Sequence, residues 1–162
     1  MIDDPALLPE EVVASVQDYI ERRHGGQALS RARSIGPGAT IKEISLSGLR
    51  GRGGGGFPTG RKWSGLRSED AGAGDRFVVC NGAEGEPGTF KDRAIMRRNP
   101  YKLLEGALVA ALSVGADRIV LGMKGSFATE IERVRAAMEE VRAEGWTDGV
   151  ELVVVEGPSH YL

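Results

Sequence analysis

The sequence predicts an α/β fold in which a parallel sheet is covered by helices. Three short apolar segments, near residues 76–80, 118–122 and 151–155, have the composition of buried strands. Two longer segments with helical spacing of apolar residues separate them, over residues 99–115 and 126–144. The order β-α-β-α-β makes a parallel sheet the economical arrangement, and 162 residues suit one core better than two.

The first 39 residues predict a helical N-terminal extension, ahead of an α/β domain over residues 40–162. Pro9 suits the first turn of a helix, whose apolar positions run from Val12 to Ile20 and which ends at Gly25 and Gly26. A second helical piece, residues 28–33, leads to the breaker at residues 36–38. Thr40 and Glu43 then have the spacing of a capping box, which predicts a new short helix from Thr40 to about Ser47.

The most unusual segment is a glycine-rich loop within residues 48–67, GLRGRGGGGFPTGRKWSGLR. It holds eight glycines, five cationic side chains and no acid. Glycine leaves backbone N–H groups unshielded, so such a segment can surround a phosphate while Arg and Lys supply the countercharge. A helix starting at Pro58 or Thr59 would add its N-terminal N–H groups. The loop therefore predicts an anion site.

Two familiar nucleotide motifs fit this segment poorly. Gly51, Gly53 and Gly56 match GxGxxG, but that fingerprint requires a preceding strand, and here a helix is expected. A P-loop interpretation of residues 55–62 fails because Trp63 follows Lys62 where a Ser or Thr should bind magnesium. The phosphate prediction rests on composition and position alone.

In parallel sheets, ligands bind beyond the carboxyl ends of the strands. The loops expected there are residues 81–93, 124–126 and 157–162, with the glycine-rich loop as a fourth wall. Residues 81–93 show no hydrophobic periodicity and are expected to be a polar loop throughout. Its acids would face the cations of the glycine-rich loop.

Composition narrows the function classes. The net charge of −2 argues against bulk nucleic-acid binding, and an isolated RGG-like run between helices is a weak RNA signal. No apolar run approaches the roughly 20 residues of a membrane span, and the acidic start lacks a secretion signal, so a cytoplasmic protein without direct membrane insertion is expected. Cys80 is the single cysteine, so this chain alone cannot supply several thiolates to an iron–sulfur cluster.

Three motifs resemble one family closely. GLRGRGGGGFPTGRKW, NGAEGEPGTFKDR and RRNPYKLLEG, in this order, resemble the flavin-containing NADH-binding subunit (the 51 kDa type, or F subunit) of respiratory NADH:quinone oxidoreductase, shared with NAD-linked hydrogenases and formate dehydrogenases. The resemblance covers about residues 40–162. It implies a Rossmann-like fold that binds FMN, takes hydride from NADH and passes electrons to iron–sulfur clusters, in a complex peripheral to the inner membrane. The implied partner is an iron–sulfur subunit of the thioredoxin-like ferredoxin type.

The resemblance also implies roles for individual residues. Gly51, Arg52, Gly53 and Lys62 correspond to the cradle of the FMN phosphate and ribityl chain, and Asn81 and Glu84 to flavin contacts. Phe57 corresponds to an aromatic ring stacked on NADH, and Glu86 to a carboxylate on the nicotinamide side. No side chain need act as a nucleophile, because the flavin performs the chemistry and the protein aligns the reactants.

Each role has a simpler alternative. Arg61 and Lys62 are equally typical of a solvated first helical turn, and Glu84 and Glu86 of ordinary turns. Phe57, before Pro58, alternatively packs at the start of the following helix.

The chain departs from the family pattern at three places. Ala83 stands where the family usually has an aspartate that hydrogen-bonds the flavin, and Gly65 stands where relatives have an aromatic residue. The sequence stops at residues 157–162, where family members continue into a Gly-Glu-Glu-Thr-Ala loop and a four-cysteine cluster domain. These departures leave open a second interpretation, a non-catalytic scaffold or assembly relative that keeps the fold.

Overall fold

A computed structural model describes residues 8–52, 55–67 and 74–158 of the chain. The helices and strands follow in the order α1 (Val16–Arg23), α2 (Gln27–Leu46), α3 (Thr59–Arg67), β1 (Phe77–Gly82), α4 (Lys91–Arg98), α5 (Pro100–Val114), β2 (Arg118–Lys124), α6 (Ala128–Ala143) and β3 (Glu151–Gly157). The three strands form one sheet in the order β1-β2-β3, and both pairings are parallel. The predicted parallel sheet is confirmed.

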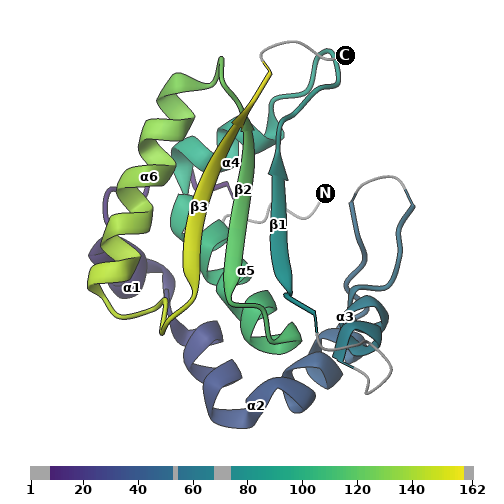
Figure 1. Ribbon diagram of the computed structural model, residues 1–162. Helices are drawn as coiled ribbons and strands as arrows, with labels where there is room; N and C mark the ends of the chain where they lie inside the picture. The colour runs from purple at the N-terminus through teal and green to yellow at the C-terminus, as the bar shows by residue number, and fades with distance from the viewer. Residues whose placement is uncertain (1–7, 53–54, 68–73, 159–162) are drawn as a thin grey trace.

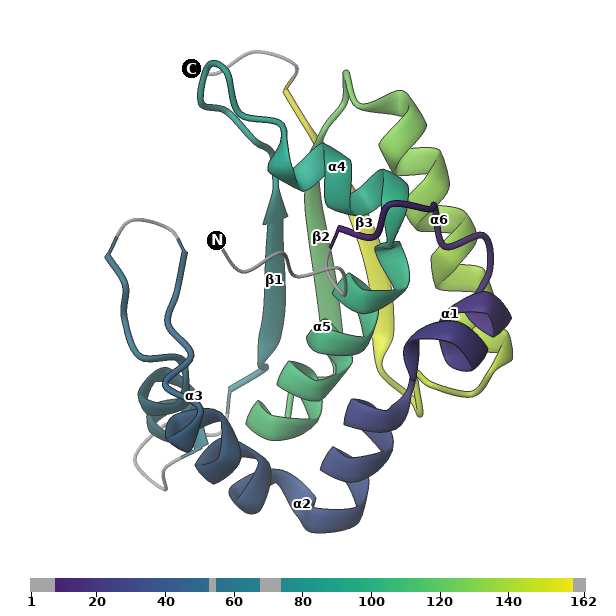
Figure 2. The ribbon, with the colours of Figure 1, turned by 180° about the vertical axis from the view of Figure 1, so that it is seen from behind.

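The helices lie mainly behind one face of this sheet (Figures 1 and 2). Helix α5 packs under β1 and β2, α6 lies at the β3 side, and α2 crosses beneath α5. Tyr101, Leu104, Ile119 and Val134 are buried in the core between these helices and the sheet. Burial of each such side chain stabilises the fold by about 1.5–3 kcal/mol. Helix α5 contributes many of the buried residues, so the core is centred on α5.

The other face of the sheet is not covered by described residues. Phe77, Val79 and Val155 are 47%, 68% and 48% exposed, and along β1 Phe77 and Val79 alternate with more buried neighbours. The segment near residues 76–80 forms the predicted strand, but its composition, which suits a strand buried on both faces, is wrong about burial, because described residues cover only one face of β1. An apolar run does not show whether one or two layers cover a strand.

Helix α5 begins and ends where the sequence predicts. The Asn99 side chain accepts a hydrogen bond from the Lys102 N–H at 3.2 Å, and Pro100 occupies the first turn without losing a needed donor. Gly115 ends the helix with φ 71°, a left-handed conformation that costs glycine little.

The N-terminal helices differ from the prediction. Helix α1 begins at Val16, where the Ser15 hydroxyl caps the Asp18 N–H at 3.1 Å, rather than at Pro9. Pro9 is buried, and its carbonyl accepts a hydrogen bond from Arg98 Nη1 at 3.0 Å. The preceding segment is therefore held against the end of α4 and does not extend the helix.

The predicted breaker interrupts helix α2: Gly36 has a non-helical backbone conformation, with φ 78° and ψ 168°, and two helical stretches meet there at a kink. The expected capping box is wrong. The Thr40 hydroxyl donates to the Gly36 carbonyl at 2.9 Å, which is an interior contact, and Glu43 pairs with Arg31. Helix α2 continues across residues 39 and 40, the expected boundary between the N-terminal extension and the α/β domain. The division of the chain into these two segments stays a prediction.

Glu105 joins the N-terminal helices to the core. Its buried carboxylate accepts hydrogen bonds from the Tyr19 hydroxyl at 2.6 Å and from the Ala28 and Leu29 N–H groups at 2.9 and 3.2 Å. The latter two are donors of the first turn of α2, which have no partner within their own helix, so the carboxylate acts as a cap contributed by another helix. Its burial is compensated by three donors.

Among the described residues, no helix combines the length and apolar character needed to cross a membrane.

Candidate functional site

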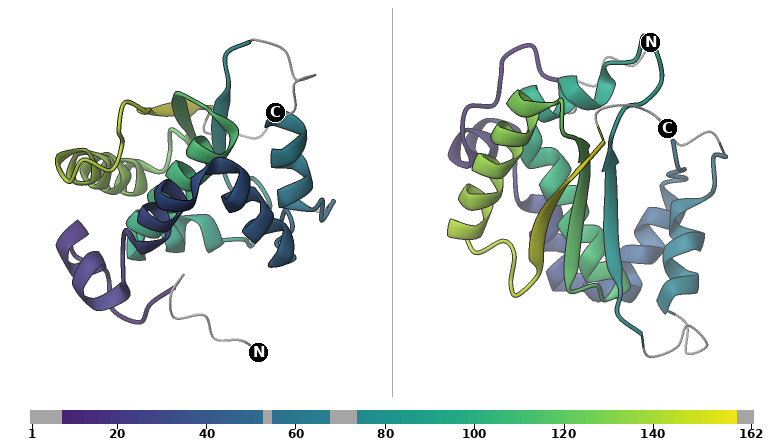
Figure 3. Two further views of the ribbon diagram at one scale, coloured as in Figure 1. Left: turned by 90° about the horizontal axis from the view of Figure 1, so that it is seen from below. Right: turned by 45° about the horizontal axis from the view of Figure 1, so that its top comes forward.

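The three parallel strands end at one edge of the sheet, and the loops after β1 and β2 lie there (Figure 3, right). The Gly125 N–H, after β2, donates to the Gly157 carbonyl at the end of β3, at 3.0 Å. After β1, residues 83–90 form the loop toward the upper side in Figure 1. This is the edge at which parallel sheets bind ligands. Residues 159–162 of the expected third loop lie outside the described residues.

The glycine-rich loop rises from α3 on the β1 side of the sheet, in the direction in which β1 runs (Figures 1 and 2). Its base is closed by two backbone hydrogen bonds, from the Gly51 N–H to the Phe57 carbonyl and from the Thr59 N–H to the Leu49 carbonyl, both at 2.9 Å. Gly60 lets α3 approach α2 closely, because a Cβ there would lie 2.1 Å from the Ser45 Oγ. Gly53 of the predicted cradle lies outside the described residues.

The cationic side chains of this loop are available to a ligand. Arg52 and Lys62 are exposed, and neither forms an ion pair with any described carboxylate. Arg50 donates to the Gly56 carbonyl at 3.1 Å, and Arg61 lies 5.9 Å from the centroid of the Phe57 ring. This donor set fits a phosphate, because it brings several cations to bare backbone and no described acid of the loop neutralises them.

Asn81 is exposed at the carboxyl end of β1. Its Oδ1 accepts a hydrogen bond from the Ala83 N–H at 3.0 Å, which turns the chain out of the strand. The amide NH₂ group forms no hydrogen bond with any described residue. This placement is compatible with the predicted flavin contact.

Glu84 lies inside the loop and differs from the other predicted site residues. Its Oε1 accepts from the Asp92 N–H at 2.8 Å, and its Oε2 from the Arg93 N–H and Nε at 3.3 and 3.2 Å. The side chain is 1% exposed, and φ is 39°, an uncommon value for a residue other than glycine. These protein donors engage both carboxylate oxygens, so a flavin contact of Glu84 stays a prediction.

The hydrogen bonds of Glu84 determine its pKa. Burial alone would raise the pKa, but the Asp92 and Arg93 N–H groups and the Arg93 guanidinium outweigh it and hold the pKa below its usual value. Glu84 is therefore ionised at neutral pH. Its charge also faces the N-terminal turn of α4, where the helix dipole favours an anion.

Both predicted NADH contacts are solvent-accessible. Phe57 is 52% exposed, so its ring is not buried as the alternative of packing at the start of the following helix requires. Glu86 is exposed in the turn after Glu84, where its carbonyl accepts from the Thr89 hydroxyl at 2.7 Å. Phe57 belongs to the glycine-rich loop and Glu86 to the β1–α4 loop, so the two come from separate walls of the site.

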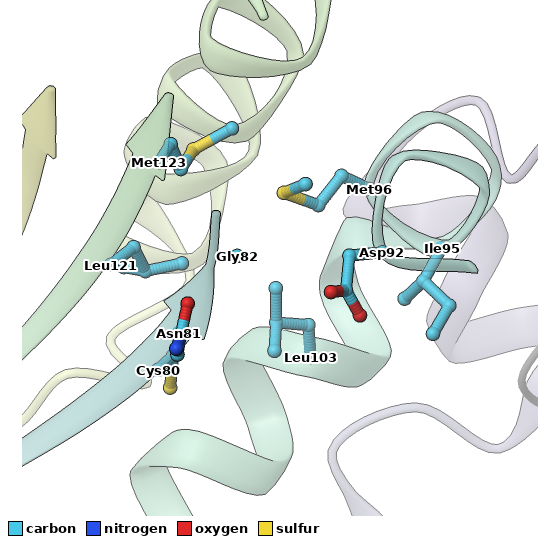
Figure 4. A pocket seen from close by; sticks show the side chains of 9 residues that line it. All are labelled: Cys80, Asn81, Gly82, Asp92, Ile95, Met96, Leu103, Leu121 and Met123. Carbon is cyan, nitrogen blue, oxygen red and sulfur yellow. The ribbon is translucent and has the colours of Figure 1, made fainter. Parts of the chain in front are cut away.

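A small apolar cavity of about 60 Å³ lies behind the end of β1. Met96 of α4 and Met123 of β2 extend toward it from opposite sides, and the Asp92 carboxylate lies at its α4 side (Figure 4). Cys80 is among its lining residues, and burial raises the pKa of this thiol to about 11. The thiol stays protonated at neutral pH, so Cys80 is a poor nucleophile.

Comparisons with known proteins identify the family. The family model described as the Nuo51 FMN-binding domain matches residues 44–162. The chain belongs to this family. The F subunit of NADH-quinone oxidoreductase from Aquifex aeolicus is 35% identical over 158 residues, which cover 93% of this chain and 36% of that protein. The mitochondrial 51 kDa subunit of NADH-ubiquinone oxidoreductase from Neurospora crassa is 47% identical over 107 residues, covering 65% of this chain and 22% of the relative.

A solved structure gives the same fold. The crystal structure of an NAD⁺-reducing [NiFe]-hydrogenase in the H₂-reduced state superposes with a TM-score of 0.76 at 31% identity, over 88% of this chain and 25% of that chain. The chain therefore spans 36% or less of the length of each of these relatives. The Rossmann-like α/β architecture is confirmed by this match.

Sequence reasoning missed helix α4 and two side chains at this edge, Arg93 and Phe127. The Arg93 guanidinium lies 5.2 Å from the Phe127 ring centroid and contacts Glu84. Arg93 ends the motif NGAEGEPGTFKDR, but nothing local shows that the chain reverses between residues 84 and 93. Glu84 lies eight residues before Asp92, which is too far for a capping-box pattern, so its contact with the helix start had no recognisable local signal.

Proposed function

We propose that this chain is the FMN- and NADH-binding part of a flavin-dependent NADH dehydrogenase. The observation that carries the proposal is the cationic glycine-rich loop beside β1, whose Arg52 and Lys62 are exposed and lack described carboxylate partners. Gly51, Arg52, Gly53 and Lys62 hold the phosphate and ribityl chain, and Asn81 and Glu84 lie on the flavin side. Phe57 and Glu86 serve the nicotinamide nucleotide. Membership in the Nuo51 FMN-binding domain family supports these roles.

The protein's task in this reaction is binding and alignment. When bound, FMN supplies the chemistry: it accepts a hydride from NADH and releases electrons singly. Lys62 and Arg52 neutralise the phosphate, Asn81 offers an amide donor at the strand end, and Phe57 presents an exposed aromatic face for stacking. Holding the flavin ring and the nicotinamide ring next to each other makes a bimolecular step effectively unimolecular.

The electrons leave to iron–sulfur clusters outside this chain. Cys80 is the single cysteine of the 162 residues, so cluster thiolates must come from elsewhere. We assign them to the further part that longer relatives have and to an iron–sulfur partner of the thioredoxin-like ferredoxin type. The names of the relatives, a quinone oxidoreductase subunit and an NAD⁺-reducing hydrogenase, support a multi-subunit setting. A cytoplasmic location, peripheral to the inner membrane through such a complex, is part of the proposal.

The test is a comparison of two flavins. The purified chain is titrated with FMN and with riboflavin, which lacks the phosphate, while flavin fluorescence is recorded. We expect FMN to be quenched and to remain with the protein through a desalting column, and riboflavin to bind at least about tenfold more weakly, as loss of a charge-assisted contact predicts. Absence of quenching with FMN would contradict the proposal, and equal affinity for both flavins would contradict the phosphate role of the loop.

A scaffold function is the second candidate, favoured by Ala83. Its methyl group cannot provide the hydrogen bond of the aspartate that the family usually has there. Restoring the carboxylate with Ala83→Asp separates the two functions. A flavin site predicts that the variant binds FMN more tightly than the unmodified chain, whereas a scaffold without a flavin site predicts no binding in either.

A further inference from the structure

Arg93 contacts more parts of the carboxyl edge than any predicted site residue does. Its Nε donates to Glu84 at 3.2 Å, its Nη2 donates to the Thr89 carbonyl at 3.3 Å, and its guanidinium lies 5.2 Å from the Phe127 ring centroid. These contacts lie in two different loops, the β1–α4 loop and the β2–α6 loop. Glu84 follows β1, Thr89 precedes α4, and Phe127 directly precedes α6.

The neighbouring contacts extend the connection to all three strands. The Phe127 N–H donates to the Lys124 carbonyl at 2.9 Å, and Lys124 Nζ lies 5.7 Å from the same ring. Gly125 donates in turn to Gly157 at the end of β3. The loops after β1 and β2 are thus linked through one guanidinium and one aromatic ring, and a backbone hydrogen bond links the β2–α6 loop to the end of β3.

We propose that Arg93 is a positioning residue that sets the shape of the flavin-side wall, residues 81–93, by locking Glu84 and clamping this wall to the β2–α6 loop. The inference rests on the proposed flavin function and adds to it the residue that aligns Asn81 and Glu86 without touching the ligand. Glu84 acts with Arg93 as one unit, because its carboxylate is 1% exposed and binds the start of α4. Ala83 makes this support more important, since the wall lacks the aspartate of the family pattern.

Arginine is the side chain suited to this position. A guanidinium is planar, donates several hydrogen bonds in one plane and places a flat face on an aromatic ring, and all three properties are used here. Lysine keeps the charge but cannot satisfy Glu84 and Thr89 while covering Phe127. The proposal therefore predicts that Arg93→Lys is not a conservative change.

The test compares Arg93→Lys and Arg93→Gln with Arg31→Gln, a matched control. Arg31 also pairs with a glutamate, Glu43, but both side chains are exposed and lie on α2. We measure FMN affinity by fluorescence titration, the visible circular dichroism of bound FMN, and hydrogen exchange of the peptides covering 81–93 and 124–131. Thermal unfolding identifies the temperature range in which each variant is folded.

We expect both Arg93 variants, while folded, to bind FMN about tenfold more weakly, in line with the loss of a charged hydrogen bond. The dichroism of bound FMN should change, and exchange should accelerate in both peptides, while Arg31→Gln changes none of these. A purely structural Arg93 would lower the unfolding temperature but leave the affinity and dichroism of the folded variants unchanged, and this result overturns the inference. Absence of FMN binding by the unmodified chain overturns the proposed function and the inference with it, whereas normal binding by the unmodified chain and by Arg93→Lys overturns the inference alone.

Discussion

The two walls of the candidate site differ in where their charges are directed. In the β1–α4 loop, the Glu84 carboxylate is buried and bound by the start of α4 and by Arg93. In the glycine-rich loop, Arg52 and Lys62 are exposed and form no ion pair with described carboxylates. The Glu84 carboxylate of the first wall binds other groups of the same wall and stabilises its conformation. The Arg52 and Lys62 side chains of the second wall remain available to bind a ligand. Substitutions of the buried Glu84 should therefore lower stability, whereas substitutions of the exposed cations on the second wall should lower affinity and leave stability nearly unchanged.

The largest expected effect concerns the base of the glycine-rich wall. In Gly60→Val, the new Cβ would meet the Ser45 Oγ at 2.1 Å and the Ser45 backbone at 2.8 Å, so α3 must move away from α2. Overpacking against backbone costs about 3 kcal/mol or more, which urea unfolding would detect. Gly106→Ala is the control, because no described atom crowds that exposed position on α5, and it should stabilise by about 0.5–1 kcal/mol. Unchanged stability of Gly60→Val would contradict the close packing of the two helices.

The second effect is the pH-dependent stabilisation by Glu84. Its folded-state pKa is lowered, so its contribution is complete above the unfolded value of about 4.3 and disappears as the pH falls through the folded value. Glu84→Gln should cost about 1–3 kcal/mol at pH 7, the range for leaving buried donors poorly satisfied. The difference from the unmodified chain should shrink below about pH 4. Glu86→Gln changes an exposed side chain and should not lower the stability. A pH-independent difference for Glu84→Gln would contradict stabilisation by the ionised Glu84 carboxylate.

The third effect tests the glycine-rich wall by affinity. Lys62→Gln should weaken FMN binding about tenfold through the lost charge, leave riboflavin binding unchanged, and alter stability by less than about 0.5 kcal/mol because Lys62 is exposed. Raising the salt concentration should reduce the difference between Lys62→Gln and the unmodified chain. An equal loss of riboflavin affinity would place Lys62 away from the phosphate.

The same contrast explains how much could be predicted from sequence. Helix α5, strands β2 and β3 and their parallel order follow from local periodicity, because each buries one apolar stripe and is bounded by recognisable caps or turns. Helix α4 was missed because KDRAIMRR is mostly charged and buries only Met96 fully. Its start depends on Glu84, which binds it from eight residues upstream. Long-range contacts of this kind have no periodic signal.

The site residues divide in the same way. The cations of the glycine-rich loop were recognisable, since no acid lies within that segment to neutralise them. The role of Glu84 was not, because a turn glutamate, a ligand contact and a helix cap have the same local sequence. The Gly-Pro-Gly breaker was recognisable, and α2 is indeed kinked at Gly36, where φ is 78°. The new helix start at Thr40 was wrong, because the Thr40 hydroxyl bonds back to the Gly36 carbonyl inside the helix.

The smallest expected effect separates the two roles of Phe57. If the ring packed at the start of α3, Phe57→Ala would destabilise the fold, but the ring is 52% exposed and contacts Arg61 from the surface. We expect a stability change below about 0.5 kcal/mol. Because stacking contributes about 0.5–1.5 kcal/mol, the variant should bind NADH a few-fold more weakly in the FMN-loaded chain, as measured by calorimetry. Phe57→Leu keeps apolar volume but has no aromatic face. If the ring packs against the fold, Phe57→Leu should therefore recover the stability lost in Phe57→Ala. If the ring stacks on NADH, Phe57→Leu should not recover the NADH affinity. A stability loss restored by leucine would show that Phe57 holds the shape of its wall instead of serving the ligand.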